Sequence, residues 1–220
     1  MPDEYALPKV LWVFWMNENN DITDSRLRWL EKMTKYSGLP VTLVTLETLP
    51  RWVLSDAPLH PAFQYLSAVH KADYLRTYFM HHYGGAYCDM KPLDSCWTEA
   101  YDELKASEAW MIGYRERKQG HVVEHAQYAW QRVLGNCAYI CKARTPFTEA
   151  WYSRMIGVMD KHQRELIKHP ALHPRAMKSD GAGYALEWAE LLGYIFHPAC
   201  IEFEQHLIGG LPPPRFQNYM

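Results

Sequence analysis

Apolar runs separated by polar turns give this chain an alternating order of predicted strands and helices. Residues 8–15 form a continuous apolar run without helical periodicity, which predicts a buried first strand. Apolar positions at helical spacing over residues 24–36, behind a cap at Asp24 or Ser25, predict a helix. The alternating run VTLVTL at 41–46 predicts a second strand. This strand–helix–strand opening is typical of nucleotide-binding α/β folds.

The middle of the chain predicts a helix that feeds a short strand. We expect this helix to begin near Ala62 and to end at Gly84 and Gly85, because glycine tolerates the left-handed conformation that follows many helices. Residues 86–88 have strand-like character. Asp89 therefore lies at the end of a strand.

Charged side chains gather around this joint. Asp73 and Arg76 lie one helical turn apart and project from one helix face. Asp89 and Lys91 share one face of the strand. Alone, the Asp–Arg pair would indicate a surface salt bridge; beside the paired glycines and Asp89 it indicates a functional site.

The rest of the chain continues the alternation of strands and helices. The further predictions are a short helix over 97–105, a strand over 110–114, an exposed charged loop over 115–118, a strand over 134–142, a helix over 147–168 that starts at Pro146, a helix over 180–192 and a strand over 193–198. No internal repeat interrupts this order, so residues 1–220 are expected to form a single α/β domain.

Composition narrows the class of protein. With 48% hydrophobic and 22% charged residues the chain is typical of globular proteins. A formal net charge of -2 argues against nucleic acid as the main partner. Five cysteines without a paired framework, and Asp3 and Glu4 where a signal peptide would be basic, predict a cytoplasmic protein. The apolar run over 10–16 is too short to span a bilayer.

The central stretch resembles the signature of the DXD-containing sugar transferases, the glycosyltransferase family 32 and capsular-polysaccharide-synthesis type. The matching segments are ADYLR at 72–76, YGGAY at 83–87 and the dipeptide Asp89-Met90. The chain departs from the family pattern at Lys91, where the family has a second aspartate. The resemblance implies a GT-A-type nucleotide-diphospho-sugar transferase fold with a mixed central sheet flanked by helices and the site at the carboxyl ends of the central strands.

The resemblance also implies a reaction and its residues. It implies transfer of a sugar from a nucleotide-sugar donor, expected to be UDP-linked, to a glycan or glycoconjugate acceptor of a surface or capsid polysaccharide. Asp73, Arg76 and Asp89 would be the catalytic residues. The donor would also contact Trp15, Met16, Asn17, Gly84, Gly85, Tyr87, Lys91, Asn136, Gly181 and His206. Asp180, Glu187 and His206 are the candidates for a general base.

The source of positive charge at the site stays open. The diphosphate leaving group gains charge as the glycosidic bond loosens, and this charge must be stabilised. In the family Mn²⁺ or Mg²⁺ does this, and here Asp89 would be its one strong protein ligand. In the alternative, Lys91, helped by some of Arg175, Lys178 and His206, supplies the charge instead.

Other interpretations are weaker. A catalytically inactive, transferase-derived sugar-nucleotide-binding or scaffold protein is the non-enzymatic alternative, in which Lys91 has abolished the metal site. Nine tryptophans and fifteen tyrosines suit base stacking, but the basic stripe of an RNA-binding module is missing. His121 and His125 share helical spacing without the glutamate of a metalloprotease motif, so they do not predict zinc. The sequence does not indicate the oligomeric state.

Overall fold

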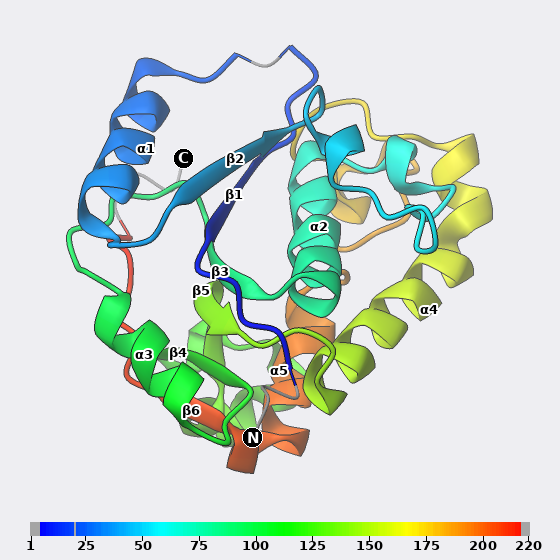
Figure 1. Cartoon of the computed structure of the whole chain (residues 1–220). Helices are drawn as coiled ribbons and strands as arrows, with labels where there is room; N and C mark the ends of the chain where they lie inside the picture. Colours follow the sequence, from blue (N-terminus) through cyan, green and yellow to red (C-terminus); the bar gives the residue numbers. More distant parts are fainter. Residues whose placement is uncertain (1–4, 20, 217–220) are drawn as a thin grey trace.

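A six-stranded mixed sheet forms the centre of the protein (Figure 1). The structure is a computed structural model that describes residues 5–19 and 21–216, so Asp3, Glu4 and the last four residues lie outside the described part. The strands are β1 (Leu11–Trp15), β2 (Val41–Thr45), β3 (Gly85–Cys88), β4 (Met111–Arg115), β5 (Leu134–Cys141) and β6 (Leu207–Gly209), in the order β2-β1-β3-β5-β4-β6. All pairings are parallel except those of β5, which runs antiparallel to β3 and β4. The predicted mixed sheet is confirmed.

Burial on both faces of the sheet explains the continuous apolar run of the first strand. In β1, Trp12 and Phe14 point into one hydrophobic cluster, and Leu11 and Val13 point into the other. Successive side chains of a strand point to opposite faces. A strand with helices on both sides therefore needs apolar residues at every position.

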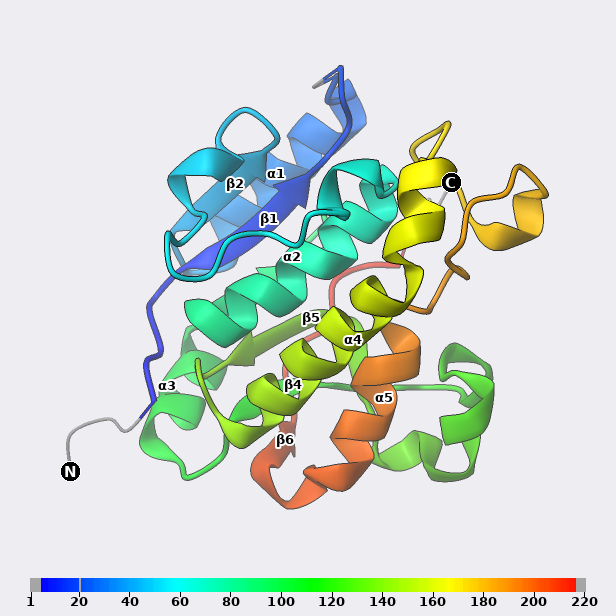
Figure 2. The ribbon, with the colours of Figure 1, turned by 90° about the vertical axis from the view of Figure 1, so that its right-hand side faces the viewer.

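Helices cover both faces of this sheet. The helices α2 (Ala68–His82), α4 (Pro146–Lys168) and α5 (Gly193–Glu202) lie over one face, as Figure 2 shows, and α1 (Asp24–Tyr36) and α3 (Thr98–Ala106) lie over the other. Short 3₁₀ segments occupy Leu49–Arg51, Phe63–Tyr65, Gln119–His121, Glu124–Arg132, Lys178–Asp180 and Glu204–His206. Within residues 5–19 and 21–216, every helix is too short or too polar to cross a bilayer.

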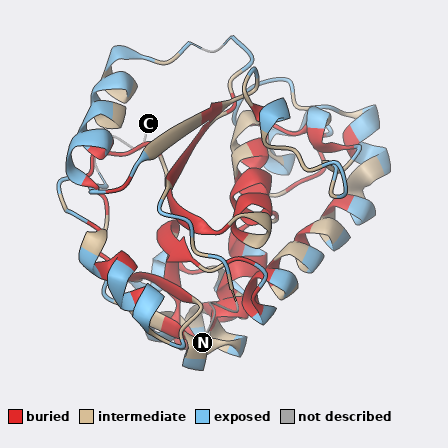
Figure 3. Cartoon of the chain, viewed as in Figure 1, coloured by how far each residue is buried: buried red, intermediate tan, exposed pale blue. Residues whose placement is uncertain are grey.

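The central helix α2 is buried along most of its length (Figure 3). It begins at Ala68 and not near Ala62, because the Ser67 hydroxyl caps it by accepting from the His70 N–H at 3.3 Å. The chain leaves the helix at Gly84, which has a φ of 70° and donates its N–H to the Phe79 carbonyl at 2.9 Å. The predicted link from helix through paired glycines to strand is confirmed.

The sequence prediction was wrong for the last helix. A short 3₁₀ segment ends at Asp180 and residues 181–192 form bends, irregular backbone and turns instead of a helix, and the strand predicted over 193–198 is the first part of α5. Ile195 and Phe196 are buried between β5 and α4, and neighbouring positions on several sides of the helix are buried too. A helix buried on several sides lacks an amphipathic period, so its apolar run resembles that of a strand.

Candidate functional site

A cleft of about 570 Å³ opens beside the carboxyl ends of β1 and β3. Trp15, the last residue of β1, and Asp89, the first residue after β3, both line it. Asp73 and Arg76 reach it from α2. Its volume is typical of small-molecule sites, and its position matches the place where open α/β sheets bind ligands.

Four charged side chains form one ion-pair cluster in this cleft. Oδ1 of Asp89 accepts from the Tyr87 hydroxyl at 2.6 Å and pairs with Nη2 of Arg76 at 3.2 Å, and Oδ2 accepts from Nζ of Lys91 at 2.5 Å. Nη2 of Arg76 also pairs with Oδ1 of Asp73 at 3.0 Å. The helix face that carries Asp73 and Arg76 therefore meets the strand end that carries Asp89, as the sequence spacing predicts.

The two carboxyl groups differ in their electrostatics. Burial raises the pKa of Asp73 to about 6, because Arg76 only partly offsets the loss of hydration. Burial also opposes ionisation of Asp89, but Lys91 and Arg76 together lower the pKa of Asp89 to about 2. Asp89 is thus an anion throughout the physiological range, whereas Asp73 takes up a proton in mildly acidic solution.

The side chains of the cleft do not fit the divalent ion that the family resemblance implies. Both carboxylate oxygens of Asp89 already accept hydrogen bonds or ion pairs, and two of these partners, Arg76 and Lys91, are cations that repel a metal ion. Hard divalent cations are held by several oxygen ligands. Among the described residues, no group of three or more His, Cys, Asp or Glu is placed to hold a metal.

The charges that line the cleft favour an anion. Its acidic residues are Asp73 and Asp89, whereas its Arg and Lys residues are Arg26, Arg76, Lys91 and Arg175. Arg26 comes from α1 and donates to the Met90 carbonyl at 2.5 Å, which ties that helix to the loop after β3. Fixed cations in a partly enclosed cleft attract phosphate groups.

The loop after β1 divides between two cavities. Trp15 lines the main cleft, whereas Met16 and Asn17 line a second pocket of about 280 Å³ together with Lys71 and other residues at the start of α2. Asn136 also lines the main cleft, and its main-chain carbonyl accepts from Nη1 of Arg76 at 2.9 Å. Of the predicted donor-side residues, Trp15 and Asn136 therefore line the main cleft, whereas Met16 and Asn17 do not.

The paired glycines do not reach the cleft. They lie at the amino end of β3, opposite the end that carries Asp89. A Cβ atom on Gly84 would stand 2.8 Å from the main-chain N of Ala143 and from the carbonyl oxygen of Ala6. The close approach of backbones, and not contact with a donor, thus requires glycine here, which corrects the donor-binding role predicted for Gly84 and Gly85.

The predicted C-terminal candidates also lie elsewhere. His206 stacks on Trp110 with ring centroids 3.7 Å apart, at the amino ends of β4 and β6, far along the sheet from Asp89. Gly181 is the exposed, left-handed residue that ends a 3₁₀ turn. Neither residue lines the cleft.

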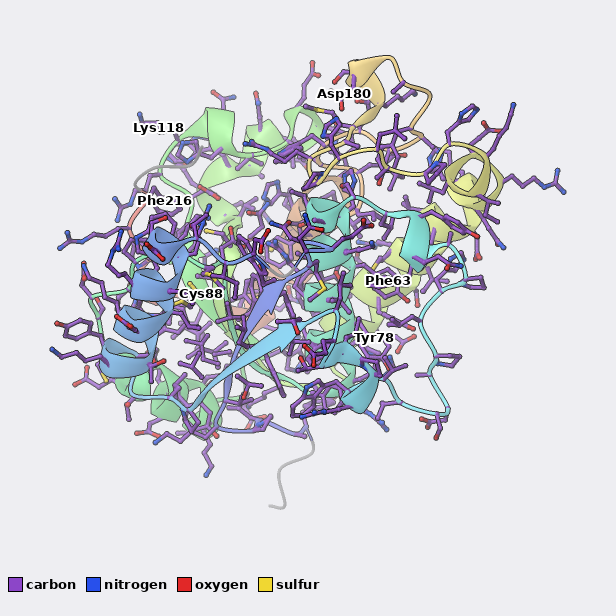
Figure 4. The ribbon with its side chains drawn as sticks, turned by 90° about the horizontal axis from the view of Figure 1, so that it is seen from above. Phe63, Tyr78, Cys88, Lys118, Asp180 and Phe216 are labelled. Atoms are coloured by element: carbon purple, nitrogen blue, oxygen red, sulfur yellow. The ribbon has the colours of Figure 1, made fainter. Side chains whose placement is uncertain are left out.

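Two of the three general-base candidates are occupied in other contacts. Asp180 accepts from the Met177 N–H at 2.9 Å and pairs with His173 at 3.2 Å. Figure 4 shows Asp180 at the outer edge of the molecule, away from Cys88 at the end of β3. The carboxylate of Glu187 lies 3.8 Å from Lys178, whose ammonium is itself exposed. Asp180, Glu187 and Lys178 do not line the cleft, whereas Arg175 does.

The sequence analysis missed several residues that line the cleft or contact its lining. Glu116 belongs to the run predicted as an exposed charged loop, yet it is buried and hydrogen-bonded to His121, which lines the cleft. Trp188 lines the cleft under the guanidinium of Arg175, 5.5 Å from its ring centroid. His197 lies on the cleft wall, where burial lowers its pKa to about 4 and keeps it neutral. The charged run around Glu116 indicated an exposed loop instead, and no local pattern indicated the positions of Trp188 and His197.

Comparisons with known proteins support the fold. No protein-family model matches this chain, and no curated protein matches its sequence. Among solved structures, the chain is similar to "PaToxG Glycosyltransferase", with a TM-score of 0.53 and 10% sequence identity over 89% of this chain and 69% of that chain. At this identity the likeness establishes the fold alone. The six-stranded mixed sheet flanked by helices is a GT-A-like arrangement, as the sequence resemblance implies.

Proposed function

We propose that this protein is a glycosyltransferase that moves a sugar from a nucleotide-sugar donor, UDP-linked in our proposal, to a glycan acceptor. The ion-pair cluster of Asp73, Arg76, Asp89 and Lys91 in the cleft carries this proposal. The family 32 type of sugar transferase is the relationship that best accounts for the sequence signature around the cluster. The GT-A-like fold is the second support.

The two cations of the cluster and Asp89 each have a task in this reaction. Lys91 and Arg76, with Arg26 and Arg175 on the cleft wall, bind the diphosphate and stabilise the charge that grows on it as the glycosidic bond breaks. Asp89, ionised and fixed by its partners, accepts hydrogen bonds from hydroxyl groups of the ribose or the donor sugar.

We also propose that the protein needs no divalent metal for this reaction. Lys91 stands where the family has the second aspartate, and its ammonium pairs with Asp89 at 2.5 Å. Lysine binds phosphate as a compact point charge. The positive charge that a metal brings to related sites therefore comes from the protein itself.

A screen of nucleotide sugars by thermal shift tests the proposal, run once with EDTA and once with MnCl₂. We expect one nucleotide sugar to raise the melting temperature in EDTA, since a ligand at 100 times its Kd stabilises by about 2.7 kcal/mol. We then expect release of the nucleoside diphosphate when that donor is incubated with glycan acceptors, also in EDTA. If no nucleotide sugar shifts the melting temperature in either buffer, the proposal is wrong.

The same screen separates the enzyme from its non-enzymatic alternative. Lys91 replaces the second aspartate of the family pattern. If catalysis needs a metal, this replacement favours a sugar-nucleotide-binding or scaffold protein that transfers no sugar. Such a protein would bind the donor but release no diphosphate over hours, with or without MnCl₂. Slow hydrolysis of the bound donor, with water as the acceptor, would be enough to exclude it.

A further inference from the structure

A hydrogen-bond donor without a partner lies in the wall of the cleft. His197 of α5 is 1% exposed and lines the cleft, and its Nδ1 accepts from the Val123 N–H at 3.2 Å. Because Nδ1 accepts this bond, the proton of the neutral ring lies on Nε2. Burial lowers the pKa of His197 to about 4, so the ring stays neutral. Within residues 5–19 and 21–216, Nε2 has no hydrogen-bond partner.

The cleft lining holds further donors of this kind. Leaving a buried polar group without a partner costs about 1–3 kcal/mol, so such groups are rare. Nε1 of Trp15 and Nε of Arg76 are likewise buried without a partner in the described part of the chain, and both residues line the cleft. Nε1 of Trp151 is unpartnered too, but Trp151 lies in the hydrophobic core. The cleft therefore suits a ligand that is rich in oxygen acceptors.

The residues of the wall around His197 are uncharged. Gly193, at the start of α5, brings them together, because a Cβ atom there would stand 2.8 Å from the side chain of Val123, 3.4 Å from that of Ala189 and 3.8 Å from the His197 ring. The cleft-lining residues of this wall are Val123, Trp188, Ala189, Leu192, Gly193 and His197. An apolar wall with one polar group suits a neutral ligand better than an ion.

Trp188 gives this wall a flat aromatic surface. It is 41% exposed, and the guanidinium of Arg175 lies over its ring, 5.5 Å from the centroid. This contact holds the ring in place. The C–H face of a pyranose ring packs on such a surface and leaves the sugar oxygens free for hydrogen bonds. Trp188 and Nε2–H of His197 together therefore match a sugar.

The wall adjoins the ion-pair cluster and also reaches solvent. Phe196, the neighbour of His197, stacks on Tyr139 with ring centroids 5.6 Å apart. The Tyr139 ring lies 5.4 Å from that of Tyr87, which donates to a carboxylate of the cluster. Trp188, in contrast, is partly exposed. A glycan whose end lies near the cluster can therefore continue past Trp188 into solvent, which a growing acceptor chain must do and a donor sugar need not.

We propose that the wall formed around His197 and Trp188 binds the terminal sugar of the glycan acceptor, a neutral pyranose, an inference that rests on the proposed transferase function. Nε2–H of His197 donates to an oxygen of this sugar, and Trp188 packs against its C–H face. The cations of the cluster bind the diphosphate of the donor, so donor and acceptor meet between the cluster and the wall. The two residues thus select the acceptor, whereas the cluster selects the donor.

Binding of simple sugars tests the site without any donor. The probes are the methyl glycosides of glucose, galactose, mannose and N-acetylglucosamine, titrated into the millimolar range with and without UDP and followed by saturation-transfer NMR. We expect at least one probe to bind, and Trp188→Ala to raise its Kd about three- to tenfold. Trp188→Phe should recover part of this loss. The matched control is Tyr36→Ala, which removes a 38%-exposed aromatic side chain on α1 that does not line the cleft and should leave the Kd unchanged.

A pair of variants tests the donor of His197. His197→Phe and His197→Gln both lose the acceptor of the Val123 N–H, so they share any cost to the fold. Only the glutamine amide can still donate where Nε2–H does. We expect His197→Phe to raise the Kd of the bound methyl glycoside about three- to tenfold and His197→Gln to raise it less. Equal Kd values for the two variants, at equal melting temperatures, would overturn the hydrogen bond to the sugar.

Transfer kinetics separate acceptor binding from donor binding. With the donor and acceptor found by the screen of nucleotide sugars, Trp188→Ala should raise the KM for the acceptor about three- to tenfold and the Kd for the donor by a smaller factor. The reverse result, a larger effect on the donor Kd than on the acceptor KM, would place the donor at this wall and overturn the inference.

The outcomes separate this inference from the function on which it rests. If the wild-type protein binds a nucleotide sugar but none of the methyl glycosides, the sugar site is wrong and the transferase stands. Methyl glucuronide bound more tightly than methyl glucoside would mean that Arg175 selects a charged sugar, which overturns the neutral acceptor. Methyl glycoside binding that depends on Trp188, in a protein that binds no nucleotide sugar, would overturn the transferase and the acceptor role and leave a carbohydrate-binding site.

Discussion

Two carboxylates of the cleft, Asp73 and Asp89, are set to different protonation states by their neighbours. Asp89 has Arg76, Lys91 and the Tyr87 hydroxyl around it, whereas Asp73 is buried with Arg76 as its ion-pair partner. The pKa of Asp73 is accordingly raised to about 6 and that of Asp89 lowered to about 2. Such a split between neighbouring acids is common where they have separate tasks.

The raised pKa of Asp73 predicts a pH dependence of stability. Its folded-state pKa of about 6 lies above the ordinary value of 3.8, so the folded protein holds this proton more tightly than the unfolded chain does. Its contribution to stability is therefore fully present below about pH 4 and is lost as pH rises to about 6. We expect Asp73→Asn to remove this decline, which amounts to roughly 2–3 kcal/mol.

Urea unfolding at several pH values measures the difference. The free energy of unfolding of wild type relative to Asp73→Asn should fall between pH 4 and 6 and stay level above pH 7. The titration of Asp89 does not overlap this pH range. Its lowered pKa places its own effect on the free energy of unfolding between about pH 2 and 4, with the opposite sign. Parallel pH profiles for the two proteins would contradict the electrostatic assignment.

We expect the charge of residue 91 to determine whether the cleft binds a metal ion, and one substitution tests this. Lys91→Asp restores two carboxylates to one strand face and removes the ammonium that pairs with Asp89 at 2.5 Å. We expect MnCl₂ to raise the melting temperature of this variant by several degrees and to leave the wild type within about 1 °C.

A neutral variant is the control for this experiment. Lys91→Met removes the ammonium without adding a carboxylate, so it should not respond to MnCl₂. A wild-type protein that is stabilised by MnCl₂ as strongly as Lys91→Asp would contradict the account of the site. Added MgCl₂ should act in the same direction, and NaCl at matched ionic strength distinguishes specific binding from general ionic strength.

At the scale of elements, the joint between α2 and β3 depends on Gly84. Its φ is 70°, and a Cβ atom there would meet main-chain atoms at 2.8 Å, which cannot move aside as a flexible side chain does. We expect Gly84→Ala to lower the free energy of unfolding by about 2–4 kcal/mol. Chemical denaturation followed by circular dichroism measures this effect.

A second glycine supplies the matched control. Gly157 lies exposed within α4, and a Cβ atom there would meet nothing within 4 Å. Gly157→Ala should therefore stabilise the protein by about 0.5–1 kcal/mol, because alanine favours the helix. Equal effects of the two substitutions would mean that the tight joint does not constrain the backbone.

An element could be predicted where the residues that determine it lie close together in the sequence. The strand before Asp89 and the end of α2 could be predicted because the glycines and the i, i+3 charge pair lie within one short stretch. The helix α5 was missed because packing on several sides erased its periodicity. Glu116 was missed because a charged run predicts an exposed loop, whereas the main-chain N–H of Glu116 bonds to the carbonyl of Val133, which is distant in sequence.

At the scale of the whole molecule, the cleft is assembled from both layers of the fold. Arg26 comes from α1 on one face of the sheet, and Asp73 and Arg76 come from α2 on the other (Figure 1). Arg175 and Trp188 come from the segment between α4 and α5. The sequence offered Arg175 only as one of several candidates, because no spacing rule relates residues so far apart.

The two layers also explain where the site is. Helices pack on both faces of the sheet, so polar groups can gather only beyond the strand ends. At the amino ends of the strands lie the tight turn at Gly84, which precedes β3, and the stacked rings of Trp110 and His206. The carboxyl ends of β1 and β3 adjoin the cleft. Residues predicted as ligands but placed at the amino ends therefore have structural roles.

The central claim is that protein cations, foremost Lys91, bind the diphosphate of a nucleotide sugar without metal. Calorimetric titration with the donor found by the thermal-shift screen, in EDTA, tests it on the wild type, on Lys91→Met and on Lys105→Met, an exposed control on α3. We expect Lys91→Met to raise the Kd at least tenfold, about 1.4 kcal/mol, with Lys105→Met unchanged. Wild-type binding that appears only with MnCl₂, or an unchanged Kd in Lys91→Met, would contradict the claim.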